Sequence, residues 1–288
     1  MRLPFVRLAL SALAVTWIAS PARGQLTSGN ATFTQLAYPG QESEPLYFSE
    51  FRPEGASTTN HLSAQWLFYR VAGDTKERAF GGYTKSDGGQ LTLTNTVAPS
   101  GDAMTYAFTE QASGGATRFT ADWTIQLSDG QAAGEATLSH SVTITNPTAA
   151  PLTISLFHFL DYDLTGEFDG HSATADLSGM TITRGSATGT YTPLTAATHY
   201  QSDAYGTIDT TLNDGGISIL SDGDSTFTNG DWIGAYQWDL VIQPGQSFTV
   251  EFEMGVSPVP EPGLVLTLAA CGLGLAGLAR RARPVARG

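Results

Sequence analysis

Apolar and polar residues alternate with a period of two along much of this chain, and this feature restricts its fold more than any other. The clearest case is Ser247–Met254, in which large apolar side chains alternate with Ser, Thr and Glu. A second case is Thr137–Asn146, and no long stretch has the 3.6-residue period of a helix. A period of two places alternate side chains on opposite faces of a strand. The pattern therefore predicts strands that are buried on one face.

Further strands are expected near 62–71, 90–97, 103–109, 117–127, 152–164, 179–184 and 231–242. Turn signals separate them, among them Asp129-Gly130, Asn146-Pro147 and Asn229-Gly230. Short strands separated in this way are typical of a sandwich or a barrel. We predict an all-β fold in which residues 25–257 form one large antiparallel β-sandwich. Two smaller sandwiches with a boundary near 147–151 are the alternative.

Two parts of the body are expected to lie outside the sheets. Residues 185–230 are dense in Gly, Asp, Ser and Thr, which predicts long loops. Residues 255–263 contain three prolines, and proline lacks the N–H that helices and central strands use. They are therefore expected to form an extended spacer.

The first 24 residues have the three parts of a secretory signal peptide. Arg2 and Arg7 precede an apolar run from Leu8 to Ala19, and small residues then allow cleavage before Gln25. Cleavage after Ala22 is a close alternative. We therefore expect an N-terminal signal helix and export of the body.

The last residues, 258–288, have a different composition. Residues 259–263 contain the motif Pro260-Glu261-Pro262, residues 264–279 carry no charge, and residues 280–288 are rich in Arg. The uncharged run of residues 264–279, followed by arginines that can extend to the lipid headgroups, predicts a short transmembrane helix. The Arg cluster predicts that the tail stays cytoplasmic and the body lies outside the inner membrane.

This tail resembles the PEP-CTERM sorting signal of Gram-negative bacteria, which is also catalogued as an ice-binding protein C-terminal domain. The matching features are the Val-Pro-Glu-Pro of 259–262, the apolar span and the terminal Arg cluster. In that family an exosortase, an integral-membrane protease, recognises the motif and removes the hydrophobic tail. The resemblance implies that Pro260, Glu261 and Pro262 are the recognition residues. It covers about the last thirty residues and names no activity for the body.

The body is strongly acidic. Seven basic residues stand against 26 acidic ones between Gln25 and Pro258, a net charge of −19. Such a body cannot neutralise phosphates, which excludes nucleic acid as a partner. The only cysteine, Cys271, lies in the tail, so the body contains neither a disulfide nor a catalytic thiol.

An acidic segment follows the strand expected near 152–164. It carries the candidate calcium ligands Asp161, Asp163, Glu167 and Asp169. Their spacing fails the EF-hand pattern, because Ser172 stands where the motif needs a bidentate Glu. An irregular oxygen-rich calcium loop remains a hypothesis, since calcium accepts varied geometry. The alternative is a set of solvated turn residues.

A second, weaker candidate calcium site consists of Asp222, Asp224 and Asp231. Asp161 and Asp163 also point to the same side of a strand, as the two carboxylates of a glycosidase must. Neighbouring acids are far more common than catalytic pairs, so we assign no catalytic residue and do not expect an enzyme. A glycosidase-like activity stays an alternative.

The histidines and tryptophans of the body are further candidate functional residues. His140 falls on an apolar strand face, which favours a core position, while His158 and His171 flank the acidic segment. The body tryptophans, such as Trp66, are expected in the core rather than on a sugar-stacking surface. Threonines two residues apart, such as Thr143 and Thr145, recur at irregular intervals along the chain. This spacing indicates hydrated strand faces rather than the regular Thr ladder of an ice-binding surface.

These observations predict an exported cell-surface or extracellular-matrix protein, sorted through its tail and held transiently or permanently in the inner membrane. Its expected partners are an exosortase-type membrane protease and extracellular polysaccharide, in which it would have a structural or adhesive role. The alternative is a carbohydrate-binding module or polysaccharide-active enzyme released after tail removal.

Overall fold

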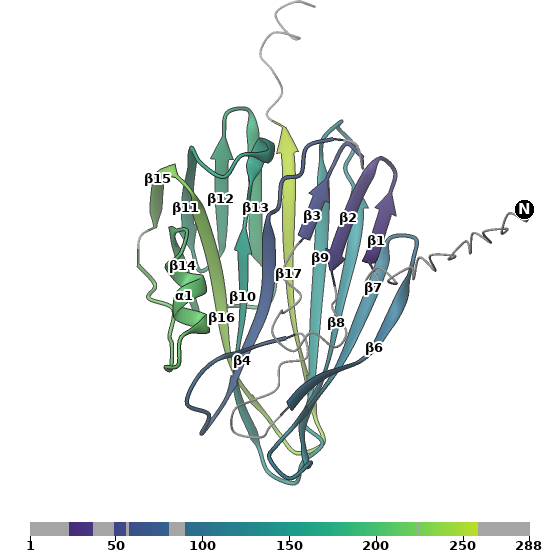
Figure 1. The fold of residues 1–288 in the computed structure, drawn as a ribbon, viewed down its shortest axis with the longest axis vertical. Helices are drawn as coiled ribbons and strands as arrows, with labels where there is room; N and C mark the ends of the chain where they lie inside the picture. Colours follow the sequence, from purple (N-terminus) through teal and green to yellow (C-terminus); the bar gives the residue numbers. More distant parts are fainter. Residues whose placement is uncertain (1–22, 37–48, 56–57, 81–89, 224, 259–288) are drawn as a thin grey trace, which may run out of the picture.

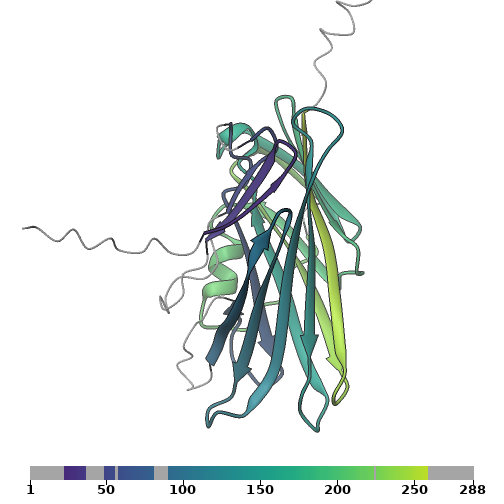
Figure 2. The same cartoon turned by 90° about the vertical axis from the view of Figure 1, so that its right-hand side faces the viewer.

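The computed structural model describes residues 23–36, 49–55, 58–80, 90–223 and 225–258. Antiparallel strands dominate them, and they form one sheet of nine strands, one of five and one of three. Figures 1 and 2 show the two larger sheets packed face to face. The prediction of an all-β antiparallel sandwich is confirmed. The predicted signal helix and transmembrane helix lie outside the described residues.

The nine-stranded sheet has the order β15-β11-β12-β13-β17-β9-β8-β7-β6. Its strands are β15 (Thr226–Gly230), β11 (His171–Asp176), β12 (Gly179–Arg184), β13 (Ala187–Pro193), β17 (Ser247–Pro258), β9 (Ala136–Thr145), β8 (Thr117–Asp129), β7 (Ala103–Gln111) and β6 (Gln90–Ser100). The five-stranded sheet consists of β14 (His199–Ala204), β16 (Trp232–Ile242), β10 (Leu152–Asp161), β4 (Ala64–Val71) and β5 (Arg78–Ala79). Both sheets take strands from either side of residues 147–151.

The smaller elements lie around these sheets. The three-stranded sheet is formed by β1 (Arg23–Ser28), β2 (Ala31–Leu36) and β3 (Ser49–Arg52). A 3-10 helix, η1 (Leu164–Gly166), follows β10, and one short α-helix, α1 (Ile208–Asn213), follows β14. Two α1 side chains, Ile208 and Leu212, are buried on the outer face of the five-stranded sheet. Within the described residues, no helix is long and apolar enough to cross a membrane.

The main core fills the space between the two larger sheets. Strands β7, β8 and β9 bury every second residue, as the alternating pattern requires. Strand β10 is buried on both faces, because the large sheet covers one and α1 with a second apolar cluster covers the other. This explains why its sequence, unlike that of β9, is a continuous apolar run.

The outer face of the large sheet is hydrated and rich in hydroxyl groups. Thr143 pairs with Thr249 through hydroxyl oxygens 2.9 Å apart, and Thr145 pairs with Ser247 at 2.7 Å. These hydroxyls bond one another across strands, which is how a β-branched polar residue stabilises a half-exposed sheet. Their role here is to hold neighbouring strands together.

Two expectations about loops are wrong. Residues 185–230 contain β13, β14, α1 and β15, because small and hydroxylated residues fit the narrow, half-exposed edge region of the sandwich. Residues 255–258, expected in the spacer, continue β17 between β9 and β13. Pro258 stands at the last position of this strand, where its missing N–H interrupts no further ladder bond.

One end of the sandwich carries the strand ends and connections that form the candidate site. Strands β8, β10 and β17 end there, and β4 and β16 begin there, as their antiparallel pairings require. It is at the top of Figure 1, and we call it the upper end.

Candidate functional site

Three acids act electrostatically on the buried carboxyl of Asp161, and we call the four residues the acid cluster: Asp161, Asp163, Asp209 and Asp231. Asp161 is the last residue of β10, and Asp163 precedes η1. Asp209 belongs to α1, and Asp231 lies between β15 and β16. Asp163, Asp231 and Asp209 all lie close enough to raise the pKa of Asp161.

Asp161 is the buried member of the acid cluster. Its side chain is 6% exposed and its Oδ1 has no hydrogen-bond partner. Burial, followed by the charges of Asp163, Asp231 and Asp209, raises its pKa to about 8. Because water cannot solvate the charged form there, the acid holds its proton at neutral pH. A neutral carboxyl can donate a hydrogen bond, which an ionised one cannot.

The neighbouring acids are less buried but have shifted pKa values of the same sign. Burial raises the pKa of Asp163, although a hydrogen bond from Ser63 and the nearby His171 oppose the shift. Burial and the charges of Asp163 and Asp169 raise the pKa of Asp231. The backbone N–H of Leu164 donates to His171 Nε2 at 3.1 Å, and burial lowers the pKa of this imidazole. The cluster thus collects negative charge with a neutral histidine beside it.

The predicted calcium ligands do not all gather in one place. Asp161 and Asp163 lie together, and Asp231 from the second predicted set joins them. Glu167 is exposed and lies 4.0 Å from the Arg184 guanidinium. Asp169 lies on the rim, where its Oδ1 accepts the N–H of Gly170 at 2.8 Å.

Asp222, also from the second set, lies elsewhere on the molecule. Its carboxylate contacts His199 Nδ1 at 2.6 Å and accepts the backbone N–H of Tyr200 at 2.9 Å. Asp224 lies outside the described residues. Among the side chains that are described, no group of three or more His, Cys, Asp or Glu residues could hold a metal ion.

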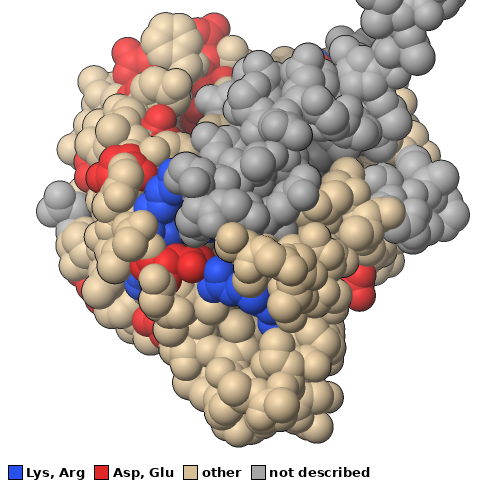
Figure 3. Space-filling view, turned by 60° about the horizontal axis from the view of Figure 1, so that its bottom comes forward, with Lys and Arg blue, Asp and Glu red and all other residues tan. Residues whose placement is uncertain are grey.

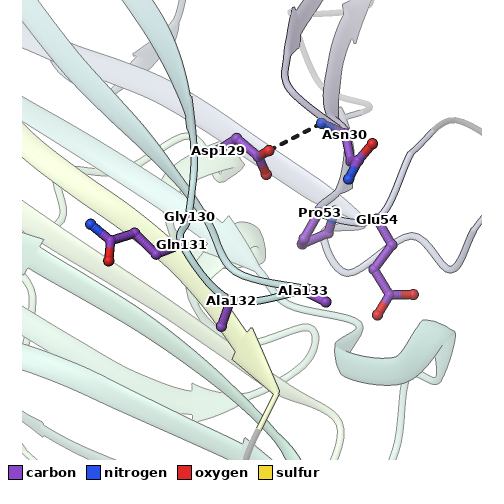
Figure 4. Close-up of a pocket in the computed structure, with 9 residues that line it drawn as sticks. Asn30, Pro53, Glu54, Asp129, Gly130, Gln131, Ala132 and Ala133 are labelled. Atoms are coloured by element: carbon purple, nitrogen blue, oxygen red, sulfur yellow. Dashed lines mark hydrogen bonds between the residues drawn. The ribbon is translucent and has the colours of Figure 1, made fainter.

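A pocket lies at the same end of the sandwich, and we call it the turn pocket. It has a volume of about 360 Å³ and is formed by three turns. Its lining residues are Asn30, Pro53, Glu54, Asp129, Gly130, Gln131, Ala132, Ala133 and Gly134. Figure 4 shows Asn30 and Glu54 on one side and the turn between β8 and β9 on the other.

Hydrogen bonds between turns hold this pocket in shape. Asp129 Oδ2 accepts the backbone N–H of Asn30 at 3.1 Å, and the N–H of Asp129 bonds to Ser28 Oγ at 3.2 Å. Gly29 has a φ of +53°, and a Cβ there would lie 1.9 Å from Asp129 Oδ2. Glycine is therefore required for the β1–β2 hairpin to approach the end of β8.

The pocket lining is polar and carries no cation. It combines amide and carboxylate groups with exposed peptide groups of glycines and small apolar surfaces of alanine and proline. Such a lining offers both donors and acceptors to a polyhydroxylated ligand, and its acids repel anions. Pockets that hold small molecules start near this size, about 300 Å³.

His61 lies between the turn pocket and the acid cluster. The charge of Glu54 acts on its imidazole from the pocket side, although burial is the larger effect and lowers its pKa. On the other side the N–H of Asp163 donates to the His61 carbonyl oxygen at 3.1 Å. The N–H of Thr165 donates to His61 Nδ1 at 3.3 Å. His61 thus connects the turn pocket to the acid cluster.

The core positions predicted for His140 and the tryptophans are confirmed. His140 is 2% exposed, and its ring stacks on Phe252 with centroids 4.6 Å apart. His158, expected beside the acids, lies instead in the core with 0% exposure. Trp66, Trp123, Trp232 and Trp238 are buried, so none of these four offers a flat surface for sugar stacking.

The described basic side chains are largely matched by acids. Arg70 pairs with Glu77, and Arg118 lies 3.0 Å from Asp74. Figure 3 shows the basic atoms of the lower end adjoining acidic ones.

Several of these residues carry no signal in the sequence that marks them as site residues. Asp209 and Glu54 stand in segments without a motif, and their approach depends on how α1 and β3 pack. Asn30 and Asp129 are ordinary turn residues in sequence. Only the contact between the end of β8 and the β1–β2 hairpin brings them together.

No family model and no curated protein matches this sequence. Among solved structures, a bacterial glucoamylase complexed with acarbose matches 89% of this chain and 35% of its own chain, with 13% identity and a TM-score of 0.49. A putative aldose 1-epimerase from Escherichia coli K12 matches 82% of this chain and 99% of its own, with 11% identity and a TM-score of 0.46. A polysaccharide lyase matches 81% and 33%, with 12% identity and a TM-score of 0.42. The chain spans about a third of the glucoamylase and the lyase.

The names of these three proteins all refer to enzymes of carbohydrate chemistry. The matches are partial and the identities low, so no activity is transferred from them to this chain.

Proposed function

We propose that this protein is exported, sorted through its C-terminal tail, and that its body binds neutral polysaccharide of the extracellular matrix. The observation that carries the binding proposal is the turn pocket. Its lining combines amide and carboxylate groups with peptide groups and small apolar surfaces. Adjacent sugar hydroxyls need donors and acceptors side by side, and a lining of this kind supplies both.

The charge of the body supports a neutral ligand. Glu54 and Asp129 line the pocket, and no lining residue is basic. A sulfated or uronic-acid polymer would be repelled by these acids and by the net charge of −19 that the body carries. Because the body tryptophans are buried, binding relies on hydrogen bonds rather than on an aromatic platform.

Export and sorting rest on the two terminal segments. Strand β17 ends at Pro258, immediately before the Pro260-Glu261-Pro262 motif. The turn pocket and the end of β17, after which the tail follows in the sequence, therefore share the upper end. An anchored protein would hold the pocket on its membrane side, and removal of the tail would release it to the matrix. Release would then be linked to polysaccharide binding.

The test is calorimetric titration of the purified protein with neutral hexose oligosaccharides and with sulfated ones of equal length. Glu54→Gln and Asn30→Ala change the pocket. Asp122→Asn is the matched control, because Asp122 lies exposed on the outer face of the large sheet. We expect a neutral oligosaccharide to bind, and each pocket variant to bind about tenfold more weakly through one lost hydrogen bond.

Three outcomes would count against the proposal. Equal binding by the pocket variants would place the ligand elsewhere, and tighter binding of sulfated sugars would contradict the role of charge. Failure to bind any sugar would favour a purely structural role. Release of reducing ends during the titration would instead favour the enzyme alternative.

A further inference from the structure

A second cavity lies on the outer face of the nine-stranded sheet at the upper end, and we call it the sheet groove. It has a volume of about 220 Å³. Its lining comes from the turn between β8 and β9, the start of β9, the end of β17 and Thr190 of β13. The groove therefore lies where the large sheet meets the turns of the upper end.

A glycine forms the floor of the sheet groove. Gly255 of β17 pairs with Thr190 of β13 on one side and with Thr137 of β9 on the other. A Cβ at Gly255 would lie 2.7 Å from Thr190 Oγ1 and 3.9 Å from Thr137 Oγ1. The two hydroxyl groups thus border a space that a side chain would otherwise fill.

These two hydroxyl groups differ from others on the same face of the sheet. Thr143 and Thr249, in β9 and β17, bond to each other through hydroxyl oxygens 2.9 Å apart. Gly255 offers no such partner, and no described residue forms a hydrogen bond with the hydroxyl of Thr137 or Thr190. Because a hydroxyl group both donates and accepts, the groove presents donors and acceptors to a polar ligand.

The sheet groove adjoins the turn pocket. Gly130 lines both cavities, and its N–H donates to the carbonyl oxygen of Glu135 at 2.8 Å, which closes the β8–β9 turn. In Figure 4 the Gln131 side chain of this turn points away from Asn30. A ligand that crosses the turn from the turn pocket therefore reaches the sheet groove.

Size and charge indicate what the sheet groove can hold. Its volume lies below the value of about 300 Å³ at which pockets for small molecules start, so it suits a part of a larger ligand. Among the described residues that line it, Glu135 is acidic and none is basic. Like the turn pocket, the groove therefore favours a neutral ligand over an anionic one.

We propose that the sheet groove is a second sugar subsite, which binds the next units of the same polysaccharide chain that occupies the turn pocket. This inference rests on the function proposed above and deepens it, because it names the ligand as an extended polymer. Thr137 and Thr190 exchange hydrogen bonds with sugar hydroxyls. Gly255 lets a sugar ring approach the backbone of the sheet closely.

The test is calorimetric titration of the purified full chain with neutral hexose oligosaccharides of one linkage, from the disaccharide to the octasaccharide. We expect affinity to rise with the length of the sugar chain, and the octasaccharide to bind about tenfold more tightly than the disaccharide. The second subsite adds hydrogen bonds without a second loss of translational freedom.

Variants assign the second subsite. Thr137→Val and Thr190→Val remove a hydroxyl group but keep the β-branched shape, and each should weaken octasaccharide binding about fivefold without changing disaccharide binding. Gly255→Ala fills the groove and should abolish the dependence on length. Alanine fits this backbone, because φ is not positive there. Thr192→Val is the matched control, since Thr192 is exposed on the same face of β13 outside the groove.

The contrary results separate this inference from the function on which it rests. Equal affinity for all lengths would overturn the second subsite and leave the turn pocket in place. Octasaccharide binding by Thr137→Val and Thr190→Val that equals that of Thr192→Val would do the same. Glu54→Gln, which changes the turn pocket alone, should weaken binding of every length. A wild type that binds no oligosaccharide would overturn both proposals.

Discussion

His158 Nδ1 lies 2.9 Å from the hydroxyl oxygen of Tyr191, and this contact joins the two larger sheets through the core. His158 belongs to β10 and Tyr191 to β13. On its other side His158 Nε2 lies 3.2 Å from the Gln65 side-chain oxygen. Both ring nitrogens are therefore engaged, and burial lowers the pKa of the imidazole well below its usual value. The interior of the sandwich thus contains a polar group that must stay neutral.

The adjacent His140 makes the free energy of unfolding depend on pH. Burial lowers its pKa to about 3, whereas in the unfolded chain it titrates near 6.5. Below about pH 6.5 the unfolded chain binds the proton and the folded one does not, so this stabilisation is lost as pH falls toward 3. Relative to His140→Gln, the wild type should lose about 3 kcal/mol between pH 7 and pH 4.

Urea unfolding of both proteins at the two pH values measures this difference. The comparison with the variant is needed because the acid cluster titrates in the same range with the opposite sign. A gap between wild type and variant that stays constant with pH would contradict a neutral, buried His140.

Asp161→Asn should stabilise the protein at alkaline pH. The folded pKa of about 8 lies above the unfolded value of 3.8, so the contribution of this carboxyl is favourable below pH 3.8 and is lost as pH rises through 8. The amide removes that loss, and we expect a gain of about 3 kcal/mol at pH 9 and almost none at pH 4. Urea unfolding of the wild type and the variant at both pH values measures it. The same gain in Asp122→Asn would point to overall charge instead.

Glu77 should be required for the loop that follows α1. Its buried carboxylate pairs with Arg70 and accepts the N–H of Ser218 at 2.8 Å. Glu77→Ala leaves Arg70 half-buried without its partner and should cost about 3 kcal/mol. Limited proteolysis should then cut near Ser218 sooner than in the wild type. Asp122→Asn should leave the cleavage rate unchanged. An unaltered rate in Glu77→Ala would show that Glu77 does not hold this loop in place.

Gly29→Ala should distort the turn pocket. The added methyl group would overlap Asp129 Oδ2, and alanine disfavours the positive φ of this position. We expect about 2 kcal/mol lower stability and loss of oligosaccharide binding. Gly101→Ala is the matched control, because φ is also positive there but a Cβ meets no atom within 4 Å. Equal binding by the two variants would argue against the pocket.

Processing of the tail is tested by intact mass. Protein recovered from the cell surface and the medium should lack the residues beyond the Pro260–Pro262 region, as the sorting resemblance implies. Replacing Glu261 with Gln should leave the tail in place if the motif is recognised. A tail retained on all wild-type material would exclude processing and leave a permanently anchored protein.

The local sequence determined the strands and the class of fold. Alternation with a period of two places the apolar side chains on one face of each strand, and a sheet forms when that face is buried. The positions of β8, β9 and β17 and the core location of His140 followed from it. It failed for residues 185–230, where small polar residues have no strong preference and join a sheet only because neighbouring strands offer free edges.

Tertiary structure alone decided the sites. Asp161 and Asp163 are neighbours in sequence, but Asp209 and Asp231 reach them only because α1 and β16 pack beside the end of β10. The turn pocket likewise exists only where the β1–β2 hairpin meets the end of β8. Burial and the approach of distant charges set the pKa of Asp161, and neither is encoded by spacing along the chain.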